Sequence, residues 1–596
     1  MTRRMSVRST YLCGLSLSVG LACTATVGGV GGQGAGSGGP SGGAGSGGVQ
    51  GGAPNGSGAG AAGGSTGATG ATGTSSGSSI PADCVGAPAQ ASAVHARLLS
   101  PSQYDNTIQD LLSVGGSPAE TNNLAGGETA ALDKTALGFR ATAAASVAAQ
   151  AAANLAAWSP CTAANAAAQA ACELQIINEV GQRAYRHALS SDDVAQMKTL
   201  FEAGVAAGGD FATGVDWLLT GILQTPDFQY QLVRPAATEQ AGQVVPIAGY
   251  EMASRLSYAV WDSMPDQALF AAAAAGLGDA ASVQAEVTRM TQNTALLVRG
   301  MSAFYSNWLN TPAYAEGIVK NDAQGNPDTN FTQAVAVSLG QSILMGATQL
   351  YAAPSPNVSA LFTGETYYMN DVLQKYYGVA GPGTPTFTPV DVAGQHRSGL
   401  LTHPAFLAVN ARPQVTAPIL RGYFVTSNLL CLGLQVPTNI VIPNLAETPQ
   451  PGLTTRELIE QTHVQAQCQS CHNVIDPPGF ALEGFDPVGN VRTTDNGKPV
   501  DTSGTMVGAG DLSGPFANGD EFLSKVPKSA TVKACFAQQF LEHAVSGEVS
   551  TPVAASDHCS VAEVSGQFAQ SGDLVGLVGL VAASNSFRFR TSEGAP

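Results

Sequence analysis

The residues Cys468-Gln469-Ser470-Cys471-His472 place two thiols three positions apart, with an imidazole directly after the second thiol. A helix is expected ahead of them, because Thr454 and Glu457 form the capping pair that opens helices. Residues three apart on a helix lie on one face, so both thiols can reach the same bound group. A chain of this composition should contain such a C-x-x-C-H pattern roughly 0.002 times by chance. The pattern therefore indicates a binding site for a group that both thiols can reach.

C-x-x-C-H is the pattern that attaches c-type haem. We expect one covalent haem c, with Cys468 and Cys471 as its thioether residues and His472 as the proximal iron ligand. A proline carbonyl just after the motif, at Pro477 or Pro478, is expected to accept the Nδ1 proton of His472. A redox dithiol would need a βαβ context, and a zinc site would need two more ligands at metal-finger spacing. The sequence offers neither.

The sixth iron ligand has two candidates. Met506 follows the motif and would give a high reduction potential, while His403 lies before it; an open sixth position is the third alternative. The haem propionates need cationic partners, and Arg397, Arg421 and Arg492 are the candidates in this part of the chain.

The first 23 residues have the features of an export signal. Arg3, Arg4 and Arg8 precede a short apolar run, which ends at Cys23. This arrangement is similar to the signal of bacterial lipoproteins, so Cys23 is the predicted lipid anchor, with plain secretion as the alternative. The predicted localisation is the bacterial cell envelope, in the periplasm or at the outer membrane and surface.

Residues 24–83 are rich in Gly, Ser and Ala and are predicted to form a disordered tether. The chain has 43 acidic and 26 basic side chains, with a formal net charge of −17. Such a surface repels phosphate backbones, so nucleic acid is not an expected partner. Membrane contact is expected through the N-terminal lipid only.

Six cysteines remain for disulfides once Cys13 in the signal, Cys23 and the two motif cysteines are set aside. Pairs that are near in sequence can close small loops between consecutive helices. The predicted pairs are Cys161 with Cys172, Cys535 with Cys559 and, by elimination, Cys84 with Cys431.

Apolar periodicity predicts a mainly α fold: a multi-helical array followed by a cytochrome c-like haem domain with a small β-hairpin. The hairpin turn is expected at Asp495-Asn496-Gly497, and Trp217, Trp261 and Trp308 are expected in the helical core. The domains are expected at 84–235 and 236–385 (helical), 386–515 (haem domain) and 516–596 (helical). Helices are expected at 141–158, 192–206, 211–223, 250–261, 281–309, 332–351, 416–431, 534–544 and 573–584.

Several segments resemble the planctomycete-type multidomain cytochrome proteins, a family that is also abundant in myxobacteria. The run from Cys468 to Arg492 resembles the haem domain of that family, and Arg397-Ser-Gly-Leu-Leu-Thr402 and Thr416-Ala-Pro-Ile-Leu-Arg-Gly422 look like the beginning of the same domain. Four further segments are similar to its domains of unknown function: 99–112, 185–189 with 218–228, 250–258 and 584–590. The resemblance implies this domain order and one haem, and no settled activity.

The leading hypothesis is an exported electron carrier that exchanges electrons with a redox partner protein of the envelope. It assigns no catalytic residue, because the sequence shows no recognisable catalytic motif beside the haem motif. The first alternative is a haem-dependent oxidoreductase of peroxidase or oxygenase type, with the helical region as substrate cleft. The second alternative is a surface binding or sensing protein with an accessory haem.

Overall fold

The computed structural model describes residues 81–594, except 87, 95, 125, 127–132, 162, 164, 237, 316, 323, 435–447, 465, 548 and 550–553. The predicted signal, Cys23 and nearly all of the predicted tether lie outside the described residues. Within the described part helices dominate and strands pair only two at a time, so the mainly α prediction is confirmed. None of the helices described there is long and apolar enough to cross a membrane.

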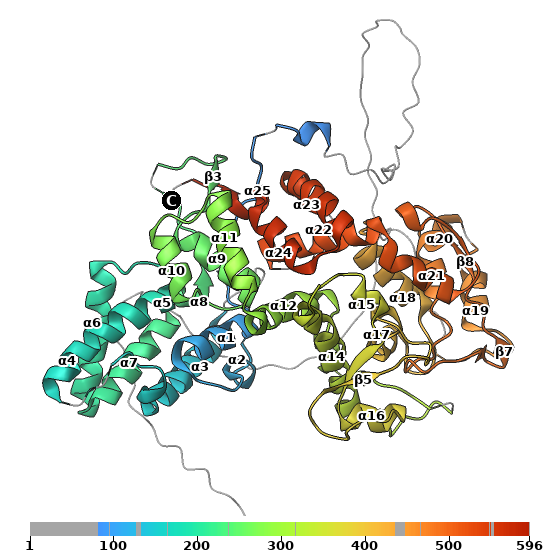
Figure 1. Cartoon of the computed structure of the whole chain (residues 1–596). Helices are drawn as coiled ribbons and strands as arrows, with labels where there is room; N and C mark the ends of the chain where they lie inside the picture. Colours follow the sequence, from blue (N-terminus) through green and yellow to red (C-terminus); the bar gives the residue numbers. More distant parts are fainter. Residues whose placement is uncertain are drawn as a thin grey trace, which may run out of the picture. The chain divides into compact units, whose positions relative to one another are not determined.

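The first helices (blue to cyan in Figure 1) share a hydrophobic core, built from buried residues between Leu99 and Phe228 together with Tyr258 and Met264. The first of them begins at a capping box, in which Ser100 and Gln103 bond each other's backbone. The elements are α1 (Pro101–Leu112), α2 (Pro118–Thr121), α3 (Lys134–Ala153), α4 (Ala166–Gln175), the π-helix η3 (Ile176–Gly181), α5 (Gln182–Tyr185), α6 (Ser191–Gly208), α7 (Phe211–Gln224) and α8 (Pro226–Gln229).

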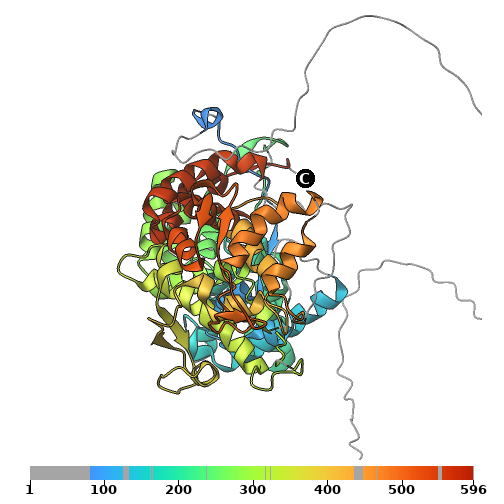
Figure 2. The same ribbon diagram turned by 90° about the vertical axis from the view of Figure 1, so that its right-hand side faces the viewer.

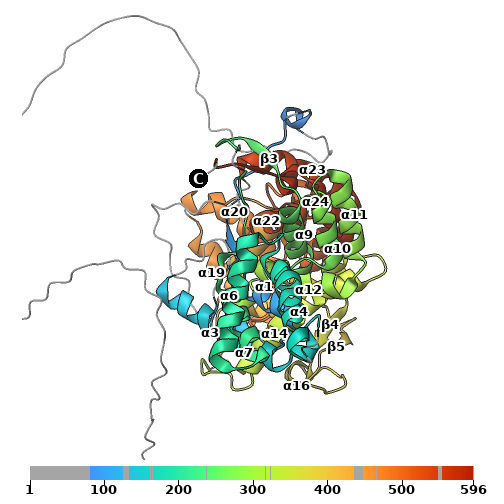
Figure 3. The same cartoon turned by 90° about the vertical axis from the view of Figure 1, so that its left-hand side faces the viewer.

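A second, larger core contains buried residues from Ile247 to Phe587. Helix α11 packs against α24, so segments almost 300 positions apart lie side by side (Figures 1 and 3). Outside the motif region its helices are α9 (Tyr250–Trp261), α10 (Gln267–Ala274), α11 (Ala280–Thr291), α12 (Thr294–Trp308), α13 (Pro312–Ala315), α14 (Gln333–Thr348), α15 (Ala360–Thr363), α16 (Asp371–Tyr377), α17 (Pro404–Val409), α21 (Gly519–Lys525), α22 (Ala530–Ser546), α23 (His558–Ser571), α24 (Leu574–Ala583) and α25 (Asn585–Arg588).

The three tryptophans that were expected in the helical core differ in their burial. Trp261 and Trp308 are buried in the larger core, as predicted. Trp217 was also expected in a core, but 44% of it is exposed, because it lies on the outer face of α7.

Short 3₁₀ turns complete the helical part: η1 (Ala82–Cys84), η2 (Leu155–Ala157), η4 (Gln349–Ala352), η5 (Leu400–Thr402), η7 (Gly510–Leu512), η8 (Val526–Lys528) and η9 (Ala555–Asp557).

In the described part of the chain the strands form five antiparallel pairs. The predicted hairpin is confirmed: its strands flank Asn496 and Gly497, both at positive φ, as a tight hairpin turn requires. The pairs are β1 (Arg97–Leu98) with β2 (Tyr230–Gln231), β3 (Val244–Pro246) with β10 (Phe589–Thr591), β4 (Thr366–Met369) with β5 (Thr388–Asp391), β6 (Thr494–Asp495) with β7 (Lys498–Pro499), and β8 (Gly504–Met506) with β9 (Gly514–Phe516).

The described residues contain three disulfides, and one of these follows the prediction. Cys161 pairs with Cys172 as expected. The predicted pairs Cys535–Cys559 and Cys84–Cys431 are wrong, because the structure joins Cys84 to Cys559 and Cys431 to Cys535.

The fold explains the difference. Thr591 at the end of β10 bonds the backbone of Ala91 and Ser92, which brings the beginning of the described chain beside the C-terminal helices and Cys84 beside Cys559. The π-helix η6 (Val425–Leu429) packs on α22. Cys431 follows it by two residues and therefore lies beside Cys535 of α22.

The motif region consists of α18 (Pro418–Phe424), the π-helix η6 (Val425–Leu429), α19 (Thr455–Thr462) and α20 (Ala466–Phe480). These helices belong to the orange part of the chain, which faces the viewer in Figure 2. Helix α18 packs closely on α20, because Gly422 and Gly479 let the two backbones meet. A Cβ at Gly422 would overlap the carbonyl oxygen of Ile475, and one at Gly479 would overlap that of Pro418.

Candidate functional site

Helix α20 contains both thiols of the motif. Cys468 and Cys471 are the free cysteines among the described residues, and both are partly buried. They are three residues apart on one helix, which places them on the same face one turn apart. The six other described cysteines are all in disulfides, so this pair is distinct among the cysteines that the structure describes.

His472, directly after the second thiol, is held by a carboxylate on its own helix. Its Nδ1 lies 2.9 Å from Oδ1 of Asp476, one turn further along α20. The Nδ1 atom of His463 lies 2.9 Å from the other oxygen, Oδ2, of the same carboxylate. The two imidazole rings are tilted by 30°, with their centroids 3.5 Å apart. Asp476 thus holds a pair of adjacent imidazoles.

This arrangement sets the protonation of both rings. A carboxylate only accepts hydrogen bonds, so each Nδ1 that faces Asp476 bears the proton. The Nε2 atom of each neutral ring then keeps its lone pair, which is the form that binds a metal ion. Within the part of the chain that the structure describes, Nε2 of His472 has no hydrogen-bond partner.

The carboxylate replaces the partner that the sequence suggested. A carbonyl of Pro477 or Pro478 was expected to accept the Nδ1 proton, but the side chain of Asp476 does so. The prolines were also expected to end the helix, whereas α20 continues through them to Phe480. The spacing of four between His472 and Asp476 is the signal that could have identified this pair in the sequence.

Arg421 was predicted to bind a haem propionate, but its guanidinium is engaged within the fold. Its side chain is fully buried between α18 and the end of α20, where it binds the backbone. Burial lowers the pKa of its guanidinium to about 10, although Glu483 and Asp486 oppose this effect. The accepting carbonyls and their distances are Leu482 at 2.9 Å, Phe485 at 3.1 Å, Asp486 at 3.0 Å and Leu407 at 3.3 Å.

Arg492 also has a structural role in this structure. It donates to the buried carboxylate of Glu483 at 2.8 Å and to Asp495 in the hairpin at 2.8 Å. Thr416 donates to the same Glu483 carboxylate at 2.7 Å. Burial raises the pKa of Glu483, and the charges of Arg492 and Arg421 oppose that rise. The group ties the hairpin to the start of α18.

Arg397 and His403, two further predicted site residues, serve the local fold. Arg397 lies over the ring of Tyr377 and donates to the carbonyl of Thr402. His403 caps α17: its Nδ1 accepts the amide of Ala405, and its Nε2 meets Ser342 Oγ at 3.2 Å. Burial lowers the pKa of His403 to about 3. Both ring nitrogens of His403 thus have partners, which does not fit the role of a distal ligand.

Met506 ends strand β8, which packs against α20. Its side chain is buried, 2% exposed, among residues of the larger core. The strand is therefore next to the motif helix, and ligation of iron by Met506 stays a prediction.

Three family models match the chain, and each is described as a protein of unknown function. PSD5 (DUF1595) matches residues 172–232, and PSD4 (DUF1592) matches residues 247–379. PSCyt3 (DUF1588) matches residues 397–495, the part with the two free thiols and the paired imidazoles. The chain contains three PSCyt and PSD domains.

The names of these PSCyt and PSD domains point to a multidomain protein related to cytochrome c. The predicted family resemblance is confirmed to this extent. No curated protein and no solved structure was found to match the chain.

Proposed function

We propose that this chain is an exported c-type cytochrome that transfers electrons in the cell envelope. Its single haem is bound through Cys468 and Cys471, with His472 as the proximal ligand of the iron. One observation supports this most strongly: these two cysteines remain thiols in a chain whose other described cysteines are paired, and they lie one turn apart beside an imidazole with a free Nε2.

The residues fit a covalently held haem. Two thiols on one helical face can bond to the two vinyl groups of one porphyrin edge, and Nε2 of the next residue can meet the iron. When bound, haem supplies a one-electron couple between Fe(III) and Fe(II). The chain itself fixes the helix, holds the proton on Nδ1 of His472 through Asp476, and leaves Nε2 as ligand.

The predicted export and lipid anchoring at Cys23 belong to the same proposal, since thioether attachment of haem takes place outside the cytoplasm. An exported redox partner protein would supply or remove the electron. The acidic composition, with a formal net charge of −17, favours a partner with a basic docking face.

The test is expression of the chain in a host with a haem-attachment system, followed by haem staining after denaturation. The native protein should retain haem, and the Cys468→Ser/Cys471→Ser variant should retain none. Ser470→Ala is the matched control, because it changes the residue between the thiols without removing a sulfur, and it should stain like the native chain. A native chain without covalent haem would overturn the proposal.

A haem-dependent oxidoreductase is the second candidate. The carboxylate on Nδ1 makes His472 a more basic ligand, and His403 is engaged elsewhere, so one expected sixth ligand is lost. Spectra of the reduced protein with carbon monoxide separate the two functions. A low-spin spectrum that carbon monoxide leaves unchanged supports electron transfer, and a carbon monoxide adduct supports the oxidoreductase.

Replacing Asp476 with asparagine should raise the reduction potential of the haem-loaded protein. An amide oxygen is a weaker hydrogen-bond acceptor than a carboxylate, so the imidazole of His472 becomes a weaker ligand of the iron. The ferric state of the haem then loses stabilisation. A change of about 1 kcal/mol corresponds to about 40 mV for a one-electron couple. Spectroelectrochemical titration measures it. Asp520→Asn on the surface of α21 is the control, and a potential equal to the native one in both variants contradicts the role of Asp476.

A further inference from the structure

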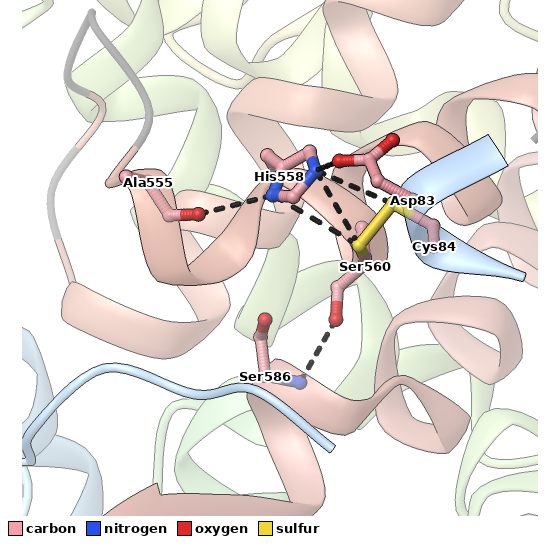
Figure 4. Close-up of a disulfide and its surroundings, with 7 residues drawn as sticks. Asp83, Cys84, Ala555, His558, Ser560 and Ser586 are labelled. Carbon is pink, nitrogen blue, oxygen red and sulfur yellow. Dashed lines mark hydrogen bonds and ion pairs between the residues drawn. A yellow bond between two sulfur atoms is a disulfide. The ribbon is translucent and has the colours of Figure 1, made fainter. Parts of the chain in front are cut away.

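The disulfide between Cys84 and Cys559 has two metal-binding side chains beside it (Figure 4). The Nε2 atom of His558 lies 3.3 Å from Sγ of Cys84 and 3.5 Å from Sγ of Cys559. The same atom lies 2.8 Å from Oδ2 of Asp83. The two sulfurs and the imidazole nitrogen therefore lie within 4.8 Å of one another, and the Asp83 carboxylate contacts the same nitrogen.

The imidazole is oriented as a metal ligand would be. Its other nitrogen, Nδ1, lies 3.1 Å from the carbonyl oxygen of Ala555, which can only accept a hydrogen bond (Figure 4). Nδ1 is therefore a donor. Nε2 faces the Asp83 carboxylate, which also only accepts, so Nε2 donates as well in this oxidised state, and its proton must leave before the nitrogen can bind a metal ion. A histidine that binds a metal commonly donates its second N–H to such a backbone carbonyl, which fixes both tautomer and ring.

The two distances from the imidazole nitrogen to sulfur suit tetrahedral zinc. Bonds of about 2.3 Å to sulfur and 2.05 Å to nitrogen put the sulfur and nitrogen ligands about 3.5 Å apart in a tetrahedron. The two distances from Nε2 to sulfur are 3.3 and 3.5 Å. Once their bond is broken, the sulfurs need only separate to about 3.8 Å, the tetrahedral edge for two such ligands.

We propose that Cys84, Cys559, His558 and Asp83 form a redox-gated site for one zinc ion. In the oxidised state shown here the disulfide closes the site. In the reduced state the two thiolates, Nε2 of His558 and the Asp83 carboxylate bind Zn²⁺ as a structural site with four protein ligands. The site is independent of the haem motif.

The gating reaction is thiol–disulfide exchange with an exported dithiol reductant. One thiolate of the reductant attacks a sulfur of the disulfide, and its second thiol resolves the mixed disulfide. The reductant leaves as a disulfide, two electrons pass to the chain, and Cys84 and Cys559 become thiols. Binding of Zn²⁺ then releases their two protons and the Nε2 proton of His558. The cluster is reachable for both reagents, since 42% of the His558 side chain and 68% of the Asp83 side chain are exposed.

The other two disulfides differ from this one. Among the described residues, the groups of three or more side chains able to hold a metal are Cys84, His558 and Cys559 of this site and the set of His463, His472 and Asp476. Neither includes a cysteine of the other two disulfides, whose sulfurs have backbone carbonyls, a serine and a glutamine as their neighbours. Reduction of those disulfides should therefore create no comparable zinc site.

The test uses the full haem-loaded chain, reduced with a phosphine, desalted without oxygen and titrated with ZnCl₂. Native mass spectrometry should show one bound zinc, and X-ray absorption at the zinc edge should show two sulfur ligands. The His558→Gln variant keeps the disulfide and should bind zinc at least tenfold more weakly. Cys161→Ser/Cys172→Ser is the matched control and should bind zinc like the native chain.

Two further variants separate zinc binding at this site from the haem motif and from unfolding on reduction. Repeating the titration with the Cys468→Ser/Cys471→Ser chain should again give one zinc, as expected of a site that does not use the motif thiols. The Cys84→His variant cannot form the disulfide and should bind zinc without any reductant, so loss of structure on reduction cannot decide the outcome. Equal zinc affinity in the native and His558→Gln chains, or no zinc in the Cys84→His variant, would overturn the proposal.

Discussion

The Arg421→Met variant should lose about 3 to 5 kcal/mol of its free energy of unfolding. The change removes a fully buried cation that donates to four backbone carbonyls and pairs with Glu483. Methionine fills a similar volume but offers no donor. The carbonyls of Phe485 and Leu407 then lose the donor that Arg421 supplies, those of Leu482 and Asp486 keep only a backbone amide, and Glu483 loses part of its charge compensation. Urea unfolding followed by far-UV circular dichroism measures the loss.

Lys525→Met is the control for the removal of a cation. Lys525 forms an exposed pair with Glu521 four residues earlier on α21, and loss of such a pair should change stability by about 0.5 kcal/mol at most. If the Arg421→Met chain were as stable as this control, the guanidinium would not be what holds α18 to the end of α20.

The second large effect concerns the disulfide between Cys431 and Cys535. The free energy of unfolding of the Cys431→Ser/Cys535→Ser variant should be about 4.7 kcal/mol lower than that of the native chain. The reason is that the bond closes a loop of 104 residues in the unfolded chain. It also holds the motif region against α22 in the folded chain. Differential scanning calorimetry and urea unfolding should both show the loss, without a change in covalent haem content.

The bond between Cys161 and Cys172 provides a matched comparison. Its separation is only 11 residues, so the Cys161→Ser/Cys172→Ser variant should lose about 2.8 kcal/mol. Equal losses in the two double variants would contradict loop closure as the source of the difference.

Local signals in the sequence predicted the elements well. The predicted helix at 250–261 has the bounds of α9, and the capping pairs at Ser100 and Thr454 begin α1 and α19. The Asn496-Gly497 turn forms the hairpin as expected. These features depend on residues within a few positions of one another, which is why the sequence alone defines them.

Features that depend on tertiary contact were predicted less well. Proximity in sequence suggested Cys535 with Cys559, but strand β10 returns to the beginning of the described chain and gives Cys559 a different partner. Arg421 was expected at a ligand, and its burial became visible only once α18 was placed on the end of α20. The carboxylate of Asp476 was missed because the two prolines after it suggested that the helix stops there.

The bond between Cys84 and Cys559 also determines where a force on the N-terminal chain enters the fold. A pull on the chain ahead of Cys84 passes through the sulfurs directly into α23, at the C-terminal end of the larger core. The backbone contacts between residues 91–92 and β10 lie behind that bond, so they are shielded from the force. A force on the N-terminal chain thus enters the fold at the C-terminal helices rather than at the helices that follow Cys84 in the sequence.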